Sequence, residues 1–216
     1  MKHLKQSMPL GLMFSMLACG LMACGEEETL ADSDTGICEL VTMEEGLACN
    51  GQLRETTPGK ALHVSPDEEL LTVCNPPAYG NHFPVWSVWG ESISPIDRGY
   101  WIHNLEHGGI GLLYRCDEGC DETIDGLRAI MEDAPLDLSC KAPTTHRLFL
   151  TSDPLLPRTP MIAAVAWGVQ YTADCLDVET VERFIETHYG NGPESLCAQG
   201  SYSSDMAAAE QSASEL

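Results

Sequence analysis

The residues best suited to chemistry lie in one short segment, His103-Asn104-Leu105-Glu106-His107, which two glycines follow. Imidazole nitrogens and carboxylate oxygens are common ligands of transition metals. On a helix, His103 and His107 would share one face about 5–6 Å apart at Cβ, close enough to bind one ion. On a strand they would lie about 13 Å apart, too far for a shared ion. The site therefore needs a helical turn or tight bend between Ile102 and Gly108.

The segments on either side of this motif favour a brief turn over a long helix. Tyr100-Trp101-Ile102 is typical of a strand, and Gly108-Gly109 would end any helix. Glu106 is three residues from His103, so a turn brings its carboxylate close enough to bind an ion or to orient an imidazole. We therefore predict a turn between two strands that carries the histidines and the glutamate.

A third histidine, His82, comes from an irregular segment over residues 75–82, where two prolines and a glycine exclude regular structure. Functional side chains are frequent on such loops. We predict that His82, His103, Glu106 and His107 bind one transition-metal ion, either copper or zinc. His63, His146 and His188 have no comparable spacing, and we expect His146 and His188 to be structural.

Two other functions fit the same residues. In the first, the histidines and Glu106 form a buried hydrogen-bond network in a non-catalytic, disulfide-rich binding or scaffold module. In the second, His103 to His107 is the H-x-x-E-H motif of zinc peptidases, in which both histidines hold zinc and the glutamate activates water. That chemistry needs the motif inside a long helix, so we expect a binding domain rather than an enzyme.

These motifs together resemble a bacterial family called domain of unknown function 3105. The pattern of that family includes G-x-H, then H-x-L-E-H-G, a later Trp-Gly pair and a Gly-Pro-Glu near the end. The chain has Gly80-Asn81-His82, the segment from His103 to Gly108, Trp167-Gly168 and Gly192-Pro193-Glu194 in the same order. The resemblance implies an exported or membrane-attached bacterial domain, and it implies no particular activity.

The N-terminus is predicted to be a lipoprotein signal peptide over residues 1–23. A positively charged start precedes an apolar stretch over residues 8–23, which is short for a membrane span. The stretch ends in Leu21-Met22-Ala23-Cys24, which resembles the lipobox of bacterial lipoproteins and implies acylation of Cys24. Two or more acyl chains would give stable anchoring. An ordinary secretory signal cleaved near Ala23 is the alternative.

The charge of the chain restricts its partners. Its 216 residues include 33 acidic and 11 Lys or Arg side chains, which gives a formal net charge of −22 at pH 7. Such a surface repels phosphate backbones and argues against binding to nucleic acid. The expected partner is a lipid bilayer, through acylated Cys24, and the sequence identifies no protein partner. We expect a lipid-anchored protein of the bacterial cell envelope that faces the periplasm or the exterior.

The cysteines predict a disulfide framework. Of the ten in the chain, Cys19 falls in the signal peptide and Cys24 is the predicted lipid site. The even number that remains is typical of cystines in an exported protein. These predicted half-cystines are Cys38, Cys49, Cys74, Cys116, Cys120, Cys140, Cys175 and Cys197. Cys116 and Cys120 could pair across a turn, with a reactive dithiol or a copper(I) site as the alternative.

The pattern of elements predicts an α+β fold, a mainly antiparallel sheet with two packed helices, in one domain over residues 37–200. Helices are expected over residues 121–133 and 178–189, where apolar residues recur at helical spacing. Strands are expected at residues 61–64, 70–73, 85–89, 109–114, 146–151 and 161–171. An acidic tether over residues 24–36 precedes the domain, and a disordered tail over residues 201–216 follows it.

Overall fold

The computed structural model describes residues 43–70, 72, 74–158 and 161–214. The predicted signal peptide, the lipid site at Cys24, the acidic tether and Cys38 lie outside these residues. No helix within the described ranges is long and apolar enough to cross a membrane.

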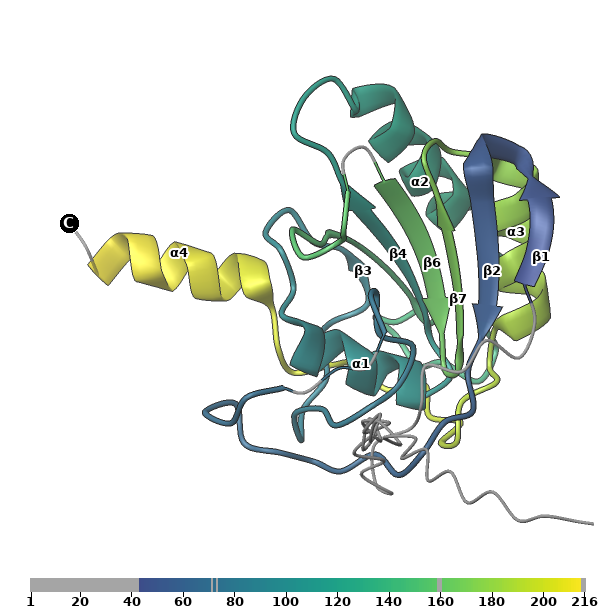
Figure 1. Ribbon diagram of the computed structural model, residues 1–216. Helices are drawn as coiled ribbons and strands as arrows, with labels where there is room; N and C mark the ends of the chain where they lie inside the picture. The colour runs from purple at the N-terminus through teal and green to yellow at the C-terminus, as the bar shows by residue number, and fades with distance from the viewer. Residues whose placement is uncertain (1–42, 71, 73, 159–160, 215–216) are drawn as a thin grey trace, which may run out of the picture. The chain divides into compact units, whose positions relative to one another are not determined.

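A seven-stranded sheet is the framework of the domain (Figure 1). Its strands are β1 (Met43–Leu47), β2 (Gly51–Glu55), β3 (Gly90–Glu91), β4 (Ile110–Arg115), β5 (Leu148–Ser152), β6 (Met161–Ala166) and β7 (Val169–Ala173). Their order in the sheet is β1-β2-β7-β6-β4-β5-β3. The pairs β1–β2, β2–β7, β7–β6 and β6–β4 are antiparallel, whereas β4–β5 and β5–β3 are parallel.

The predicted α+β class is confirmed, and the sheet is mixed rather than purely antiparallel. The parallel pair β4–β5 arises because the chain crosses over through a helix between these strands, and a crossover returns the chain in the same direction. The apolar run over residues 161–171, expected as one β-like segment, is a hairpin of β6 and β7. Gly168 allows its tight turn, with a φ of +79° that other residues rarely adopt.

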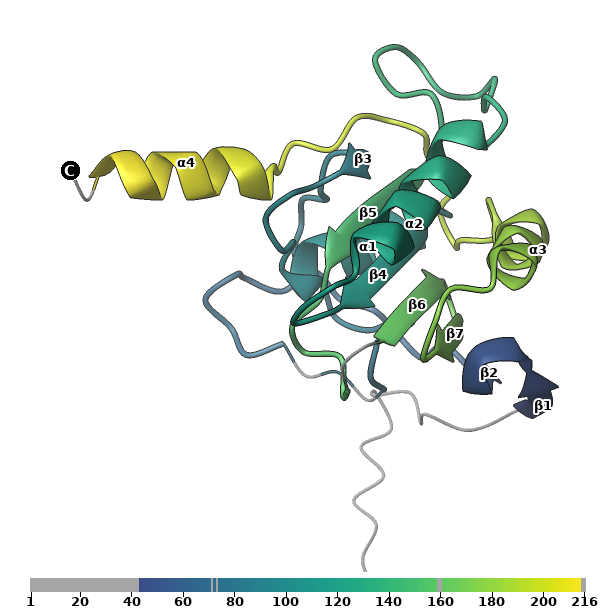
Figure 2. The same ribbon diagram turned by 90° about the horizontal axis from the view of Figure 1, so that it is seen from above.

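Helices cover both faces of the sheet. They are α1 (Arg98–Glu106), α2 (Asp121–Asp133) and α3 (Val178–His188), and α4 (Ser204–Ser214) follows near the C-terminus. Neighbouring residues of β4 point to opposite faces, because side chains alternate along a strand. Leu112 packs in the core under α2 and α3, and Leu113 packs in the core against α1. Figure 2 shows α2 and α3 on the same side of the sheet.

The helices expected over residues 121–133 and 178–189 correspond to α2 and α3. In α3, the Asp177 carboxylate caps the N-terminus by accepting a hydrogen bond of 3.2 Å from the Thr180 backbone N–H. In α2, Asp121 is the first helical residue and Cys120 occupies the cap position without a side-chain bond. Asp121, the residue in this segment suited to cap the helix, therefore does not cap it, although its charge lies at the positive end of the helix.

The central motif lies on α1, a longer helix than the brief turn that we predicted. Asp97 starts this helix by accepting a hydrogen bond of 2.8 Å from the Gly99 backbone N–H. Trp101, Ile102 and Leu105 are fully buried. Side chains typical of a strand therefore lie on a helix, because burial on the sheet outweighs their weak intrinsic preference.

Two segments expected as strands are irregular instead. Residues 61–64 contribute only an isolated bridge between His63 and His82, and residues 85–89 only a bridge between Ser87 and Tyr202. Residues 71 and 73, in a third expected strand, lie outside the described part. Side chains satisfy backbone groups in these segments. The Asn104 amide oxygen, for example, accepts hydrogen bonds from Ser87 N–H at 3.0 Å and Ser87 Oγ at 2.9 Å.

The tail over residues 201–216 was expected to be disordered, but residues 204–214 form α4. This segment is rich in alanine, a strong helix former. Its first turn is also tied to the loop after β3. The Asp205 carboxylate accepts hydrogen bonds from Ile93 N–H at 3.2 Å and Ser94 N–H at 2.6 Å. These hydrogen bonds hold the start of α4 against the domain, and the composition of the tail does not predict them.

Three cystines link the described residues: Cys49–Cys175, Cys116–Cys120 and Cys140–Cys197. Cys74 is disulfide-bonded as well. The Cys49–Cys175 bridge joins residues 126 positions apart and ties the segment between β1 and β2 to the end of β7. Cys116 and Cys120 pair locally, as their spacing suggested.

Candidate metal centre

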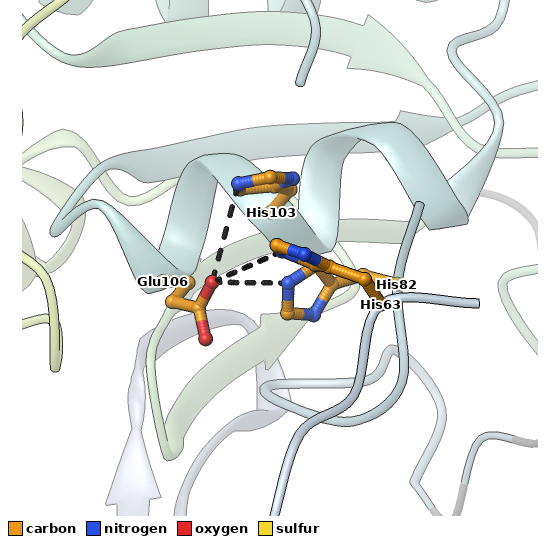
Figure 3. Close-up of side chains that lie close together, drawn as sticks. All are labelled: His63, His82, His103 and Glu106. Carbon is orange, nitrogen blue, oxygen red and sulfur yellow. Dashed lines mark hydrogen bonds and ion pairs between the residues drawn. The ribbon is translucent and has the colours of Figure 1, made fainter. Parts of the chain in front are cut away.

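Helix α1 and two loops bring a group of histidines and a glutamate together. On α1, His103 and Glu106 are three residues apart and so share one face. The loops of residues 63 and 82 lie beside that face (Figure 3). They are joined by hydrogen bonds from His82 N–H to Leu62 O at 3.0 Å and from Val64 N–H to His82 O at 2.8 Å. This bridge places His63 next to His82.

The resulting group is His63, His82, His103 and Glu106, which we call the three-histidine group. One ligand atom from each residue lies within 4.8 Å of those of the others. The Glu106 Oε2 atom is 3.0 Å from His82 Nε2, 3.9 Å from His63 Nε2 and 4.0 Å from His103 Nε2 (Figure 3). Three imidazole nitrogens therefore surround one carboxylate oxygen.

The backbone fixes the orientation of two of these rings. His82 Nδ1 lies 2.9 Å from Gly80 O, and His103 Nδ1 lies 2.7 Å from Phe83 O. A carbonyl oxygen only accepts, so each Nδ1 carries a hydrogen and donates it. In the neutral ring, the lone pair is then on Nε2, which faces the group. Metal-binding histidines are commonly held in this way, with the second nitrogen donating to a carbonyl.

The contact between His82 and Glu106 requires a positive charge. With its hydrogen on Nδ1, neutral His82 presents a lone pair to the Glu106 carboxylate at 3.0 Å. Two acceptors at that distance repel each other unless a proton or a metal ion lies between them. His82 is fully buried.

The pKa values of His103 and Glu106 are both lowered, which leaves His103 neutral and Glu106 charged. Burial is the main cause that lowers the pKa of His103, and the nearby His82 and His63 add to it, although the bond to Phe83 O raises it. His103 therefore favours the neutral form, which binds metals. Burial raises the pKa of Glu106, but the hydrogen bond and charge of His82 and the charges of the other histidines outweigh it and lower the pKa. Glu106 is therefore ionised near neutral pH.

His107, the fourth predicted ligand, belongs to a different group. One ligand atom each from Glu106, His107 and Glu194 lie within 4.8 Å of one another. His107 Nε2 is 3.4 Å from Glu194 Oε2. Burial lowers the pKa of His107 to about 4, with a smaller contribution from His103. The structure thus brings His82, His103 and Glu106 together and places His107 beside Glu194.

His63 and Glu194 are the members that sequence reasoning missed. His63 was set aside because the next histidine in the sequence, His82, is 19 residues away and is reached only across the bridge between loops. The sequence offered one sign that His63 has a role: it is a polar residue between two apolar ones, Leu62 and Val64. Glu194 was already in the Gly-Pro-Glu motif, so its place in a shared pattern was the signal for it.

The separation of His107 from the three-histidine group also bears on the hydrolase hypothesis. In H-x-x-E-H peptidases, both histidines of the motif bind the same ion. Here His103 and His107 fall into different ligand groups, and Glu106 lies within both. No candidate ligand group among the described residues contains both histidines, although their rings are in contact, with centroids 4.7 Å apart.

A hydrogen-bonded network holds the C-terminal end of α1. Arg147 Nη1 donates to His107 O at 2.9 Å, and its Nη2 lies 3.0 Å from Asp137 Oδ2. Burial raises the pKa of Asp137, but bonds from Ser139 and Tyr189 and the Arg147 charge lower it to about 2. The ionised Asp137 therefore keeps Arg147 in place under the end of the motif.

The Gly-Pro-Glu segment meets the same end of α1. Glu194 N–H donates to Glu106 O at 3.0 Å, and Gly190 N–H donates to Gly108 O at 2.9 Å. Residue 192 must be a glycine, because a Cβ there would lie 2.3 Å from Glu106 O and 2.3 Å from Gly108 N. The close approach of these two backbones positions Glu194 beside His107.

Comparison with known families identifies the class of this domain. Residues 63–200 match the family described as "Protein of unknown function (DUF3105)". The match covers more than half of the chain, so the protein belongs to this family, and the expected resemblance is confirmed. No curated protein and no solved structure matches the chain.

Proposed function

We propose that this protein is an extracytoplasmic lipoprotein whose domain binds a transition-metal ion, zinc or copper, through His63, His82, His103 and Glu106. The convergence of three Nε2 atoms on Glu106 Oε2 carries the proposal. Imidazole nitrogens suit both metals, and a carboxylate is compatible with them. Three histidines and one carboxylate would complete a four-coordinate site.

The distances within the group fit an ion after small adjustments. Metal–nitrogen bonds of about 2.0–2.1 Å in a tetrahedral site place neighbouring ligand atoms about 3.4 Å apart. The three distances to Glu106 Oε2 lie on both sides of this value, from 3.0 to 4.0 Å. The His63 side chain is 52% exposed, so it has room to move toward an ion. The buried rings of His82 and His103 would stay fixed by their carbonyl partners.

The proposed location rests on the N-terminal sequence. The apolar stretch before Cys24 and the Leu-Met-Ala-Cys segment suit a lipoprotein signal, and the acidic residues after Cys24 suit a spacer. Acylated Cys24 would anchor the domain to the bilayer, facing the periplasm or the exterior. The cystines of the domain support this location, because disulfides persist in oxidising compartments.

Elemental analysis of the tag-free, full-length protein, equilibrated separately with Zn²⁺ and with Cu²⁺ and then desalted, tests metal binding. At least one ion per chain is expected, and His82→Ala should lose it. At a thousandfold excess of Zn²⁺ over its Kd, binding should stabilise the fold by about 4 kcal/mol, or about 10 °C in Tm. His188→Ala, on α3 across the sheet, is the matched control and should retain the ion. A wild-type protein without zinc or copper would refute the proposal.

The non-catalytic scaffold module remains the second candidate, favoured by one observation. His82 and His103 already donate hydrogen bonds to carbonyl oxygens, at 2.9 and 2.7 Å, without any ion. In this case a chelator would leave the Tm unchanged, whereas His103→Ala would still lower it by several degrees. Thermal unfolding with and without EDTA therefore separates the two candidates.

A further inference from the structure

Glu106 is shared by two groups of ligands, and only one of them belongs to the proposed site. Its carboxylate faces His63, His82 and His103, and it also lies within 4.8 Å of ligand atoms of His107 and Glu194. A carboxylate has two oxygens, so a single glutamate can contact two ions. We call Glu106, His107 and Glu194 the second group.

The His107 side chain lacks the hydrogen bonds that buried imidazoles normally make. It is 2% exposed, and its Nδ1 has no hydrogen-bond partner among the described residues. Its Nε2 faces Glu194 Oε2 at 3.4 Å, longer than a usual N–H···O hydrogen bond. His82 and His103, in contrast, each use Nδ1 to donate to a carbonyl. The nitrogen that faces Glu194 is Nε2, so Nε2 would bind the ion, and Nδ1 is the nitrogen left without a partner among the described residues.

The fold holds the second group together from both sides. The His107 ring packs edge-on against Trp86, with ring centroids 4.4 Å apart, and its carbonyl accepts a bond from Arg147. Glu194 is fixed by its backbone bond to Glu106 O at 3.0 Å. The group also places two carboxylates within 4.8 Å of each other, an arrangement in which like charges repel unless a cation lies between them.

We infer that Glu106, His107 and Glu194 form a second metal site for a divalent transition ion such as Zn²⁺, so that Glu106 bridges two ions. This inference rests on the proposed function for the first ion. One imidazole and two carboxylates are a ligand set that Zn²⁺ accepts. The Glu194 side chain is 60% exposed, so the second ion would enter and leave from the solvent side of the domain. The more buried three-histidine group would hold its ion more firmly.

Zinc stoichiometry of the full-length protein, measured by elemental analysis and by calorimetric titration with Zn²⁺, tests the inference. The wild type should bind two ions. Glu194→Gln removes the charge of this carboxylate without changing the size of the side chain. This variant should bind one ion firmly, because the Kd of the second ion is raised at least tenfold. Glu186→Gln, an exposed glutamate on α3, is the matched control and should bind two. His82→Ala should lose the first ion, and Glu106→Gln should weaken both.

The outcomes separate the inference from the function on which it rests. A wild type that binds one ion, lost in His82→Ala and unchanged in Glu194→Gln, overturns the second site and keeps the first. One ion lost in both variants means a single shared centre, which also overturns the inference. No ion at all overturns both. Circular dichroism of each variant in EDTA checks that it folds, so that a lost ion reports a lost ligand.

Discussion

Replacement of Gly192 by alanine tests how tightly the Gly-Pro-Glu segment is packed against the end of α1. The added Cβ would lie 2.3 Å from Glu106 O, 2.3 Å from Gly108 N and 2.7 Å from Gly108 Cα. All three are backbone atoms, so no side chain can rotate away. Because non-bonded carbon atoms pack about 3.5–4.0 Å apart, the segment has to retreat by about 1 Å.

That retreat breaks two backbone hydrogen bonds, from Glu194 N–H to Glu106 O and from Gly190 N–H to Gly108 O, now 3.0 and 2.9 Å long. Each bond contributes about 0.5–1.5 kcal/mol net, so the expected loss is about 1–3 kcal/mol. For a chain of this size, the corresponding fall in Tm is about 2–12 °C. Urea denaturation followed by circular dichroism measures it.

Gly126→Ala is the matched control for this change. Its Cβ would meet Leu176 Cδ2 at 2.5 Å, the end of a flexible side chain. Gly126 also lies inside α2, where alanine is favoured over glycine by about 1 kcal/mol. This variant should be as stable as the wild type or more so. If Gly192→Ala unfolds at the same urea concentration as the wild type, the close approach of the two segments is wrong.

Three further predictions concern the framework of the site. Asn104→Leu leaves buried polar groups of Ser87 unpaired, at about 1–3 kcal/mol for each, and should lower the urea midpoint strongly. Leu127→Ala, at a fully buried position, should cost about 2–5 kcal/mol through the cavity it leaves. Although burial raises the pKa of Asp137, its hydrogen bonds and the Arg147 charge lower it to about 2. This carboxylate therefore stabilises the fold above about pH 4, by about 1 kcal/mol after screening. The gain disappears as the pH falls to 2, so the free energy of unfolding from urea titrations should be lower at pH 2.5 than at pH 6. In Asp137→Asn, the free energy of unfolding should depend less on pH.

The two amphipathic helices were predictable, and the helix of the motif was not. In α2 and α3, apolar residues recur at helical spacing, and Pro135 and Gly190 mark where the helices end. In α1, burial extends over Arg98 to Leu105, almost the whole helix, so no polar face reveals the period. Asp97 was the visible sign of a helix start, and the strand-like residues after it concealed that sign.

The candidate site shows the same division between local and non-local information. His103 and Glu106 are close in sequence, and their spacing predicts that they share one face if the segment is helical. His63 reaches the group only through a bridge between two loops, which depends on hydrogen bonds between residues 19 positions or so apart. No period or spacing within a single segment encodes that contact. Glu194 is likewise brought in by tertiary structure, through its bond to the end of α1.

The half-exposed position of His63 has a kinetic consequence. An ion in the three-histidine group would have three ligands inside the protein and one on a loop at its surface, so a competing ligand from outside could replace that histidine first. Exchange by single replacements does not require the domain to unfold. The group would therefore release its ion faster than a fully enclosed site of equal affinity.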